Sequence, residues 1–339
     1  MKNYISILIL SFAIFFISNC TQIDSENNNK FVFLSNRESP KGEFDIFISD
    51  LYDTSQINLT QNIEFIRSIS KPLLSSKKKF VLYTSFDRKL KSLHIIDLKN
   101  KKDMYLSDVN MDNPNASFID NDNKVLFTKN IKGTKQLFTI NVNGTSEENI
   151  SSSNNNEYNA QVSYDNRTMS FLRKVKNKTF IIIRNIITKN EDSIQVNGNN
   201  VNPTFADDNK IVYESFVKGS YKVFVYDIIS KHIEQITTGD ANAHDPVFVN
   251  EGKSMLFITD GRGKKYRDLC ILNLKTKKYK FLTSDLNMIN QNYSLSRDKN
   301  KIIFESSQFN NSEIYFLKLN DKNIINLSQN SAWDCNPSF

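Results

Sequence analysis

The chain has 339 residues, and its 44 lysines and arginines outnumber its 37 aspartates and glutamates, which gives a formal net charge of +7. Cysteine use is sparse, with three in the whole chain, and hydrophobic residues make up 39%. A chain of this length is large for one hydrophobic core. It fits one domain only if repeated units bury their faces against their neighbours.

The first 19 residues predict a signal peptide. Lys2 precedes an apolar run from Tyr4 to Ile17, which is too short to span a bilayer as a helix. The next residues, Ile17 to Cys20, resemble a bacterial lipobox, which implies acylation of Cys20; the alternative is a plain signal peptide with an incidental cysteine. Acyl chains would hold the protein at a membrane. Residues 20–30 are polar and predict a tether.

Seven units repeat along the rest of the chain, residues 31–339. Each has an aromatic residue in its second strand, and the gaps between successive aromatics are 50, 44, 44, 42, 44 and 47 residues. The aromatics are Phe33, Tyr83, Phe127, Phe171, Tyr213, Phe257 and Phe304. A period of this length with four short strands per unit is typical of propeller blades. The predicted fold is therefore all-β, a seven-bladed β-propeller of four-stranded blades.

The strands are predicted from short β-branched and aromatic segments, such as residues 222–227 and 301–306, that are bounded by Asn, Asp, Ser and Lys. Only nine glycines serve the whole chain. We expect Asn and Asp to take the left-handed turn positions in their place, for example at Asp120 to Asn123 and at Asp165-Asn166.

The two ends of the repeat region complement each other. Residues 331–339 repeat the first strand of a unit and then stop, whereas residues 31–35 form a second strand with no first strand ahead of it. Pairing of the two ends would complete one blade and close the ring. Unit seven should then stand between Cys270 and Cys335, so we expect no disulfide between them.

The best-matching segments, Glu313 to Leu317, Asn58 to Thr60 and Phe281 to Thr283, resemble the TolB-like propellers built from WD40-like (PD40) repeats. The resemblance covers about Lys30 to Phe339. It implies a propeller and a protein of the bacterial cell envelope. Sorting rules of related bacteria, applied to Thr21 after Cys20, imply the outer membrane, on its periplasmic or surface face, rather than the inner membrane.

A ring of polar residues is expected at the channel mouth, where the innermost strands begin. Its predicted partner-binding members are Asn113, Asn159, Asn202, His244, Asp245, Asn292, Trp333 and Asn336, and Lys71 holds the corresponding place in the second unit. These side chains could instead cap their own strand-entry turns. A metal site is not predicted, because His244-Asp245 has no second histidine nearby in the repeat pattern.

Loops between second and third strands form a second predicted surface, on the same face as that mouth. Its basic residues are Arg88, Lys89, Lys132, Lys174, Lys176, Arg262, Lys264 and Lys265. With a net charge of +7 such a face would attract an anionic partner. Alternatively, these lysines only solvate the loops.

No catalytic motif is present: there is no G-x-S-x-G, no phosphate-binding glycine loop and no zinc pattern. We therefore expect a monomeric, lipid-anchored binding or scaffold protein without enzymatic activity or cofactor, whose partner is an envelope protein or anionic ligand and not a nucleic acid. The alternative is a channel-mouth hydrolase or lyase acting on a sugar or lactone, with His244 and Asp245 as acid-base residues.

Overall fold

Seven four-stranded antiparallel sheets stand around a central channel in the computed structural model of the chain. The structure describes residues 29–38, 43–53, 55–61, 63, 70–87, 90–111, 113–198, 201–308, 311–321 and 323–339. The predicted signal peptide, Cys20 and the basic residues Arg88 and Lys89 lie outside these ranges. The prediction of a seven-bladed propeller is confirmed. Among the described residues no helix is long and apolar enough to cross a membrane.

Each blade is a meander that runs from the channel outwards. Blade 1 contains β28 (Asp334–Ser338), β1 (Lys30–Ser35), β2 (Asp45–Asp50) and β3 (Gln56–Asn58); blade 2 contains β4 (Leu73–Leu74), β5 (Phe80–Asp87), β6 (Leu90–Asp97) and β7 (Lys102–Asp108); blade 3 contains β8 (Ser117–Ile119), β9 (Lys124–Ile131), β10 (Thr134–Asn141) and β11 (Glu148–Asn149).

The other four blades follow the same order. Blade 4 contains β12 (Asn156–Val162), β13 (Thr168–Val175), β14 (Lys178–Asn185) and β15 (Glu191–Val196); blade 5 contains β16 (Thr204–Asp207), β17 (Lys210–Val217), β18 (Ser220–Asp227) and β19 (Ile233–Gln235); blade 6 contains β20 (Ala243–Val249), β21 (Ser254–Thr259), β22 (Asp268–Asn273) and β23 (Tyr279–Phe281); blade 7 contains β24 (Ile289–Leu295), β25 (Lys301–Gln308), β26 (Asn311–Lys318) and β27 (Ile324–Asn326).

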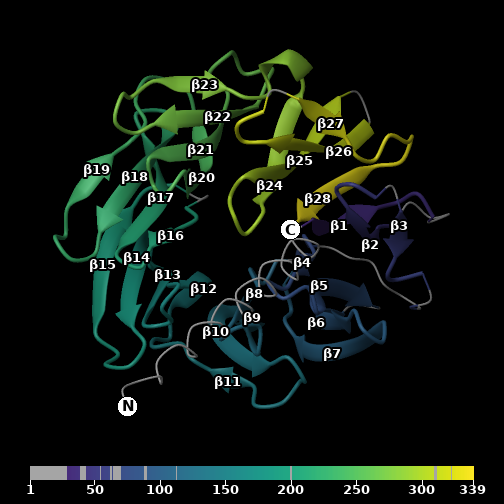
Figure 1. The fold of residues 1–339 in the computed structure, drawn as a ribbon. Coiled ribbons are helices and arrows are strands. Elements are labelled where there is room, and N and C mark those ends of the chain that lie inside the picture. The colour runs from purple at the N-terminus through teal and green to yellow at the C-terminus, as the bar shows by residue number, and fades with distance from the viewer. Residues whose placement is uncertain are drawn as a thin grey trace, which may run out of the picture.

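The C-terminal strand β28 closes the ring by pairing with β1, as the sequence predicts (Figure 1). The pairing is held at one end by a bidentate ion pair, in which both carboxylate oxygens of the buried Asp334 lie 2.8 Å from Arg37 Nη2. At the other end the ring of Phe339 meets that of Phe31 edge-on, with centroids 6.5 Å apart. Polar and apolar contacts therefore both fix the last strand.

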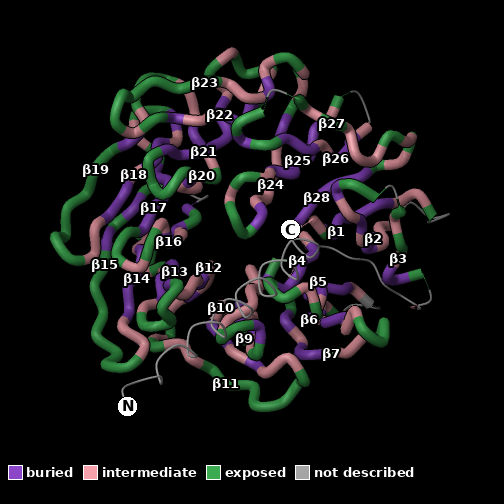
Figure 2. The backbone as a smooth tube through the Cα atoms, viewed as in Figure 1, coloured by how far each residue is buried: buried purple, intermediate pink, exposed green. Residues whose placement is uncertain are grey.

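The hydrophobic core lies between adjacent blades. All seven repeat aromatics of the second strands are buried, and several stack on an aromatic in the third strand, as Phe33 does on Phe47 and Phe304 on Tyr315, with centroids 5.7 Å apart in both pairs. Such cross-strand pairs stabilise each sheet beyond the burial of their area. Figure 2 shows buried stretches along these strands and exposed ones at the outer turns.

A hydroxyl residue after the fourth strand completes the sheet in five blades. Its Oγ accepts a hydrogen bond from a backbone N–H of the third strand, at 2.8 to 3.1 Å. These residues are Thr60, Ser151, Thr237, Thr283 and Ser328. The short fourth strand leaves that N–H unpaired, which explains why a Thr or Ser follows Leu or Ile at this place in the repeat.

The two ends of the propeller differ in their turns. We call the end with the turns between first and second strands the hairpin face, and the opposite end, with the turns between second and third strands, the basic face. Positive φ occurs at Asp120, Asn121, Asp122 and Asn166 on the hairpin face, as expected for Asn and Asp. Lysines also adopt it, including Lys132 and Lys176 at exposed turn tips of the basic face.

Candidate binding site in the channel

Bulges in the innermost strands place polar residues in the channel wall. Asn159, Asp245, Asn292 and Asn336 each have φ between 50° and 55° and each coincides with a break in the register between the first and second strands. An extra residue in one strand bends it and redirects a side chain. These four residues therefore lie within their strands, whereas the sequence predicted them at the strand starts.

The amide predicted at Asn113 has a different role from its counterparts. Asn113 Oδ1 accepts a hydrogen bond at 3.0 Å from the backbone N–H of Asn115, and Asn115 has the positive φ. Asn115 stands twelve residues before the core aromatic of its blade, as Asp245 and Asn292 do in theirs. This constant spacing is the signal that identifies the bulge residue, and it places the bulge residue of blade 3 at Asn115, two residues after the predicted Asn113.

Three amides link neighbouring blades along the wall. Asn115 Nδ2 donates to Asn159 Oδ1, and Asn159 Nδ2 donates to Asn202 Oδ1 at 3.1 Å. The residues come from blades 3, 4 and 5, so the run joins blades rather than capping each strand by itself. These amides of the predicted ring therefore form hydrogen bonds with one another within the channel wall.

Two buried glutamates, which sequence reasoning missed, hold the bulges of the next blade. Glu214 in β17 is 1% exposed and accepts from the backbone N–H of Asp245 at 2.8 Å. Glu305 in β25 is 2% exposed and accepts from the N–H of Asn336 at 3.2 Å, and also from Asn292 Nδ2 at 2.8 Å. An ionised carboxylate suits this place because it only accepts.

Lys71 extends from blade 2 to blade 7. Its Nζ donates to the backbone oxygen of Tyr293 at 3.4 Å. Burial lowers the pKa of the ammonium from 10.5 to about 8, against the opposing effect of the Asp245 and Glu305 carboxylates. The channel thus contains an ammonium group that loses its proton at a lower pH than an ordinary lysine.

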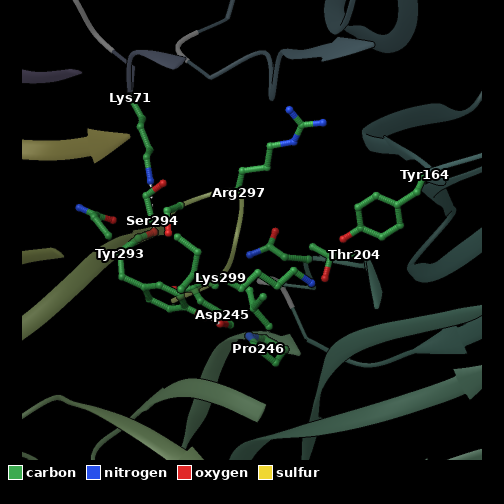
Figure 3. Close-up of a pocket in the computed structure, with 14 residues that line it drawn as sticks. Lys71, Tyr164, Thr204, Asp245, Pro246, Tyr293, Ser294, Arg297 and Lys299 are labelled. Atoms are coloured by element: carbon green, nitrogen blue, oxygen red, sulfur yellow. Dashed lines mark hydrogen bonds between the residues drawn. The ribbon is translucent and has the colours of Figure 1, made fainter. Parts of the chain in front are cut away.

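A pocket of about 580 Å³ occupies the channel beside these residues. It begins at Lys71, Asn202, Asp245 and Asn292 and reaches the hairpin face, where Tyr164, Arg297 and Lys299 line it. Figure 3 shows the side chains of Lys71, Arg297, Tyr164 and Asp245 around one space. Three cations and one carboxylate are among the described residues that line the pocket, together with amides, hydroxyls and the apolar Pro246, Val247 and Leu295. The charged part of this lining favours a ligand with a negative charge.

His244 and Trp333 do not line this pocket. His244 Nδ1 lies 2.7 Å from Glu214 Oε2, and its ring stands 5.0 Å from that of Tyr221. The hydrogen bond to Glu214 raises the pKa of His244, and burial raises the pKa of Glu214. Trp333 is 39% exposed and donates its backbone N–H to Asn36 Oδ1 at 2.9 Å. The structure therefore places these two side chains outside the pocket that Asp245 lines.

The predicted basic residues that the structure describes lie around the basic face. They are Lys132, Lys174, Lys176, Arg262, Lys264 and Lys265, and none of them lines the channel pocket. Arg262 is held by Asp268, with Nε 2.7 Å from Oδ2, whereas Lys264 and Lys265 are exposed. Within the described part of the chain no cluster of three or more His, Cys, Asp and Glu could hold a metal ion.

The fold and the channel together define a class, the β-propellers closed by strands from both termini. No protein-family model matches the chain, and no curated protein matches it by sequence. Solved structures match by fold, and the fold is that of a TolB-like propeller. TolB from Acinetobacter baumannii is 13% identical with a TM-score of 0.57, and the match covers 91% of this chain and 66% of that one.

Two further solved structures are similar. Puromycin hydrolase matches with a TM-score of 0.69 at 9% identity, over 89% of this chain and 52% of its own. The propeller domain of the Trilobed protease from Pyrococcus furiosus, described as having an open velcro topology, matches with a TM-score of 0.60 at 14% identity, over 80% of this chain and 85% of its own. This chain thus spans about half to two thirds of the length of TolB and the hydrolase.

Proposed function

We propose that the protein is a binding or scaffold module of the bacterial cell envelope, and that its channel pocket receives an anionic polar segment of a protein partner. One observation carries the proposal: among the described residues that line the pocket, Lys71, Arg297 and Lys299 are cationic and Asp245 is the single acidic one. A negatively charged group would gain from these cations in a recess partly shielded from water.

The cellular address belongs to the same proposal. It rests on the predicted signal peptide, on acylation of Cys20 and on the envelope role that the TolB-like resemblance implies. The proposed location is the outer membrane. Neither the leader nor Cys20 lies within the described residues, so mass spectrometry of the mature N-terminus is the direct test of this part.

Binding is favoured over catalysis by the arrangement of the two acid-base candidates. Asp245 lines the pocket, whereas the adjacent His244 is directed to the buried Glu214. General acid-base catalysis requires groups that converge on one reacting atom. His244, the partner of Asp245 in the hydrolase or lyase alternative, therefore does not reach this pocket.

Site-specific photocrosslinking tests the channel proposal. Tyr164 is 64% exposed at the pocket rim, so p-benzoylphenylalanine can replace it at little cost in stability. Irradiation of intact envelopes should give one adduct with a protein partner. Arg297→Glu should abolish the adduct, because it places a negative charge against an anionic segment.

Lys275→Glu is the matched control. It makes the same change of charge at an exposed position of the outer turn between β22 and β23, away from the pocket. The adduct should survive it. Failure to obtain an adduct from position 164, or an equal yield in Arg297→Glu, would refute the proposal.

A further inference from the structure

A second pocket, of about 390 Å³, lies between blades 5 and 6, away from the channel. The outer edge of blade 5 lines one side of it. In blade 4 the fourth strand β15 has six residues, and its Ile194 and Val196 are buried against blade 5. In blade 5 the fourth strand β19 has three residues, all exposed. The chain then continues through small residues, 237–243, which leave space between blades 5 and 6.

The floor and one wall of this pocket are apolar and aromatic. Phe257, Ile236 and Leu272 form the buried floor. Tyr279 and Phe281 of β23 form the wall, edge to face with centroids 5.6 Å apart. A flat ring entering here could continue the edge-to-face arrangement, which stabilises aromatic contacts beyond the burial of their area.

The charged groups of the lining neutralise each other. Glu234 and Lys277 are the two charged lining residues, and Lys277 Nζ lies 3.1 Å from Glu234 Oε1. The Asn242 side chain is also engaged, since its Nδ2 donates to Asp260 Oδ2 at 2.7 Å and its Oδ1 accepts from the N–H of Tyr221 at 2.9 Å. A charged ligand would find no unpaired counter-ion in this lining.

We propose that the pocket between blades 5 and 6 binds a small neutral molecule with a flat aromatic ring. The volume lies within the range of small-molecule sites, and the pocket combines the apolar and aromatic side chains of its floor and wall with polar side chains such as Thr237, Thr259 and Gln235. This site is independent of the proposed function, because none of its lining residues lines the channel pocket.

Gly261 provides a way to fill the pocket. A Cβ built on it would meet Thr259 Oγ1 at 3.4 Å, Phe281 Cζ at 3.5 Å and Ala241 Cβ at 3.7 Å, all of them atoms of lining residues. These are near-ordinary contacts, and Gly261 is not among the glycines with positive φ. A leucine at this position should therefore fold normally and occupy the space that the ligand would need.

The test uses two dyes with the same ring system. N-phenyl-1-naphthylamine is neutral, and 8-anilino-1-naphthalenesulfonate adds a sulfonate. The neutral dye should bind to the folded chain saturably at one site, with a rise in fluorescence, and more tightly than the anionic dye. Gly261→Leu should abolish this binding. Tyr279→Ala should weaken it about three- to tenfold by removing half of the aromatic wall.

Tyr52→Ala is the matched control. Tyr52 of blade 1 is 62% exposed and meets Phe316 of blade 7 edge-on, whereas Tyr279 is 63% exposed and meets Phe281 in the same manner. Dye binding should be unchanged in this variant. The proposal is overturned if Gly261→Leu and Tyr279→Ala, both folded by circular dichroism, bind the neutral dye as the wild type does, or if the anionic dye binds this site more tightly.

Discussion

Buried carboxylates connect one blade to the next through single residues. Glu214 and Glu305 each accept the backbone N–H of a bulge residue in the following blade, Asp245 and Asn336 respectively. A buried donor left without an acceptor costs about 1 to 3 kcal/mol. The shape of the channel wall at blades 6 and 1 thus depends on residues that do not line the pocket.

Replacing Glu305 by glutamine should show this dependence. One carboxylate oxygen would become an NH₂ group facing donors, since Glu305 also accepts from Gln291 Nε2 at 2.8 Å and Ser312 Oγ at 3.1 Å. We expect the free energy of unfolding, measured in urea, to fall by about 1 to 3 kcal/mol. The same change at the exposed Glu251 should have little effect; an equal loss there would contradict this explanation.

Lys71 should make stability depend on pH in the alkaline range. Because burial lowers its pKa from 10.5 to about 8, the folded state binds fewer protons than the unfolded state between these values. The free energy of unfolding therefore rises with pH in this window, and the cost of the buried charge is fully present below it.

The measurement compares Lys71→Met with the wild type in urea at several pH values. The stability of wild type relative to the methionine variant should increase as the pH rises from about 8 towards 10.5. Lys71→Arg serves as the control, because arginine keeps its charge throughout this range. A constant difference between wild type and Lys71→Met would show that Lys71 has no lowered pKa.

Among the elements, β28 has the largest effect on the whole ring. It supplies the innermost strand of blade 1, the carboxylate of Asp334 for Arg37 and the ring of Phe339 for Phe31. Without it, β1 would expose an unpaired edge and a strip of buried apolar residues.

Removal of residues 334–339 should therefore open the propeller. We expect the truncated chain to unfold at lower urea concentration and to self-associate through the free edge of β1, which light scattering after size-exclusion chromatography would detect. Phe339→Ala, which leaves the strand pairing in place, should remain monomeric. A truncated chain that stays monomeric and as stable as the wild type would show that closure is dispensable.

Some structural features of the elements could be predicted from the sequence and others could not. The spacing of the aromatics and the split blade were predictable, because the core between blades requires a large side chain at one position in every repeat. The bulges were not predicted. The spacing to the core aromatic could have located Asn159 and Asp245, but the positive φ there depends on the paired strand. In the sequence, Arg297 and Lys299 indicate an ordinary polar turn between two strands. Only in the closed ring does this hairpin lie beside the channel.

At the scale of the whole molecule, both faces carry cations, in different settings. The basic face has exposed lysines such as Lys132, Lys264 and Lys265 at its turns, and the hairpin face has the mouth of the channel pocket. A protein with a net charge of +7 will adsorb to polyanions in general. Only a comparison of the faces can show whether one of them binds preferentially.

Retention on a heparin column provides that comparison. Lys264→Glu/Lys265→Glu alters the basic face, and Lys99→Glu/Lys101→Glu makes the same change of net charge at the turn between β6 and β7 on the other face. We expect the first pair to lower the salt concentration of elution more than the second. Equal shifts would mean that net charge alone determines retention and that the basic face is not a docking surface.

The point at which the chain enters the propeller bears on how a partner could reach the channel. Strand β1 begins on the hairpin face, where Lys301 Nζ donates to Asn29 Oδ1 at 2.7 Å. If Cys20 is acylated, the nine residues before Asn29 span at most about 30 Å. The mouth of the pocket would then face the lipid surface. A partner would then approach parallel to the membrane, through a thin layer above the bilayer. Lengthening the tether between Cys20 and Asn29 should admit larger partners.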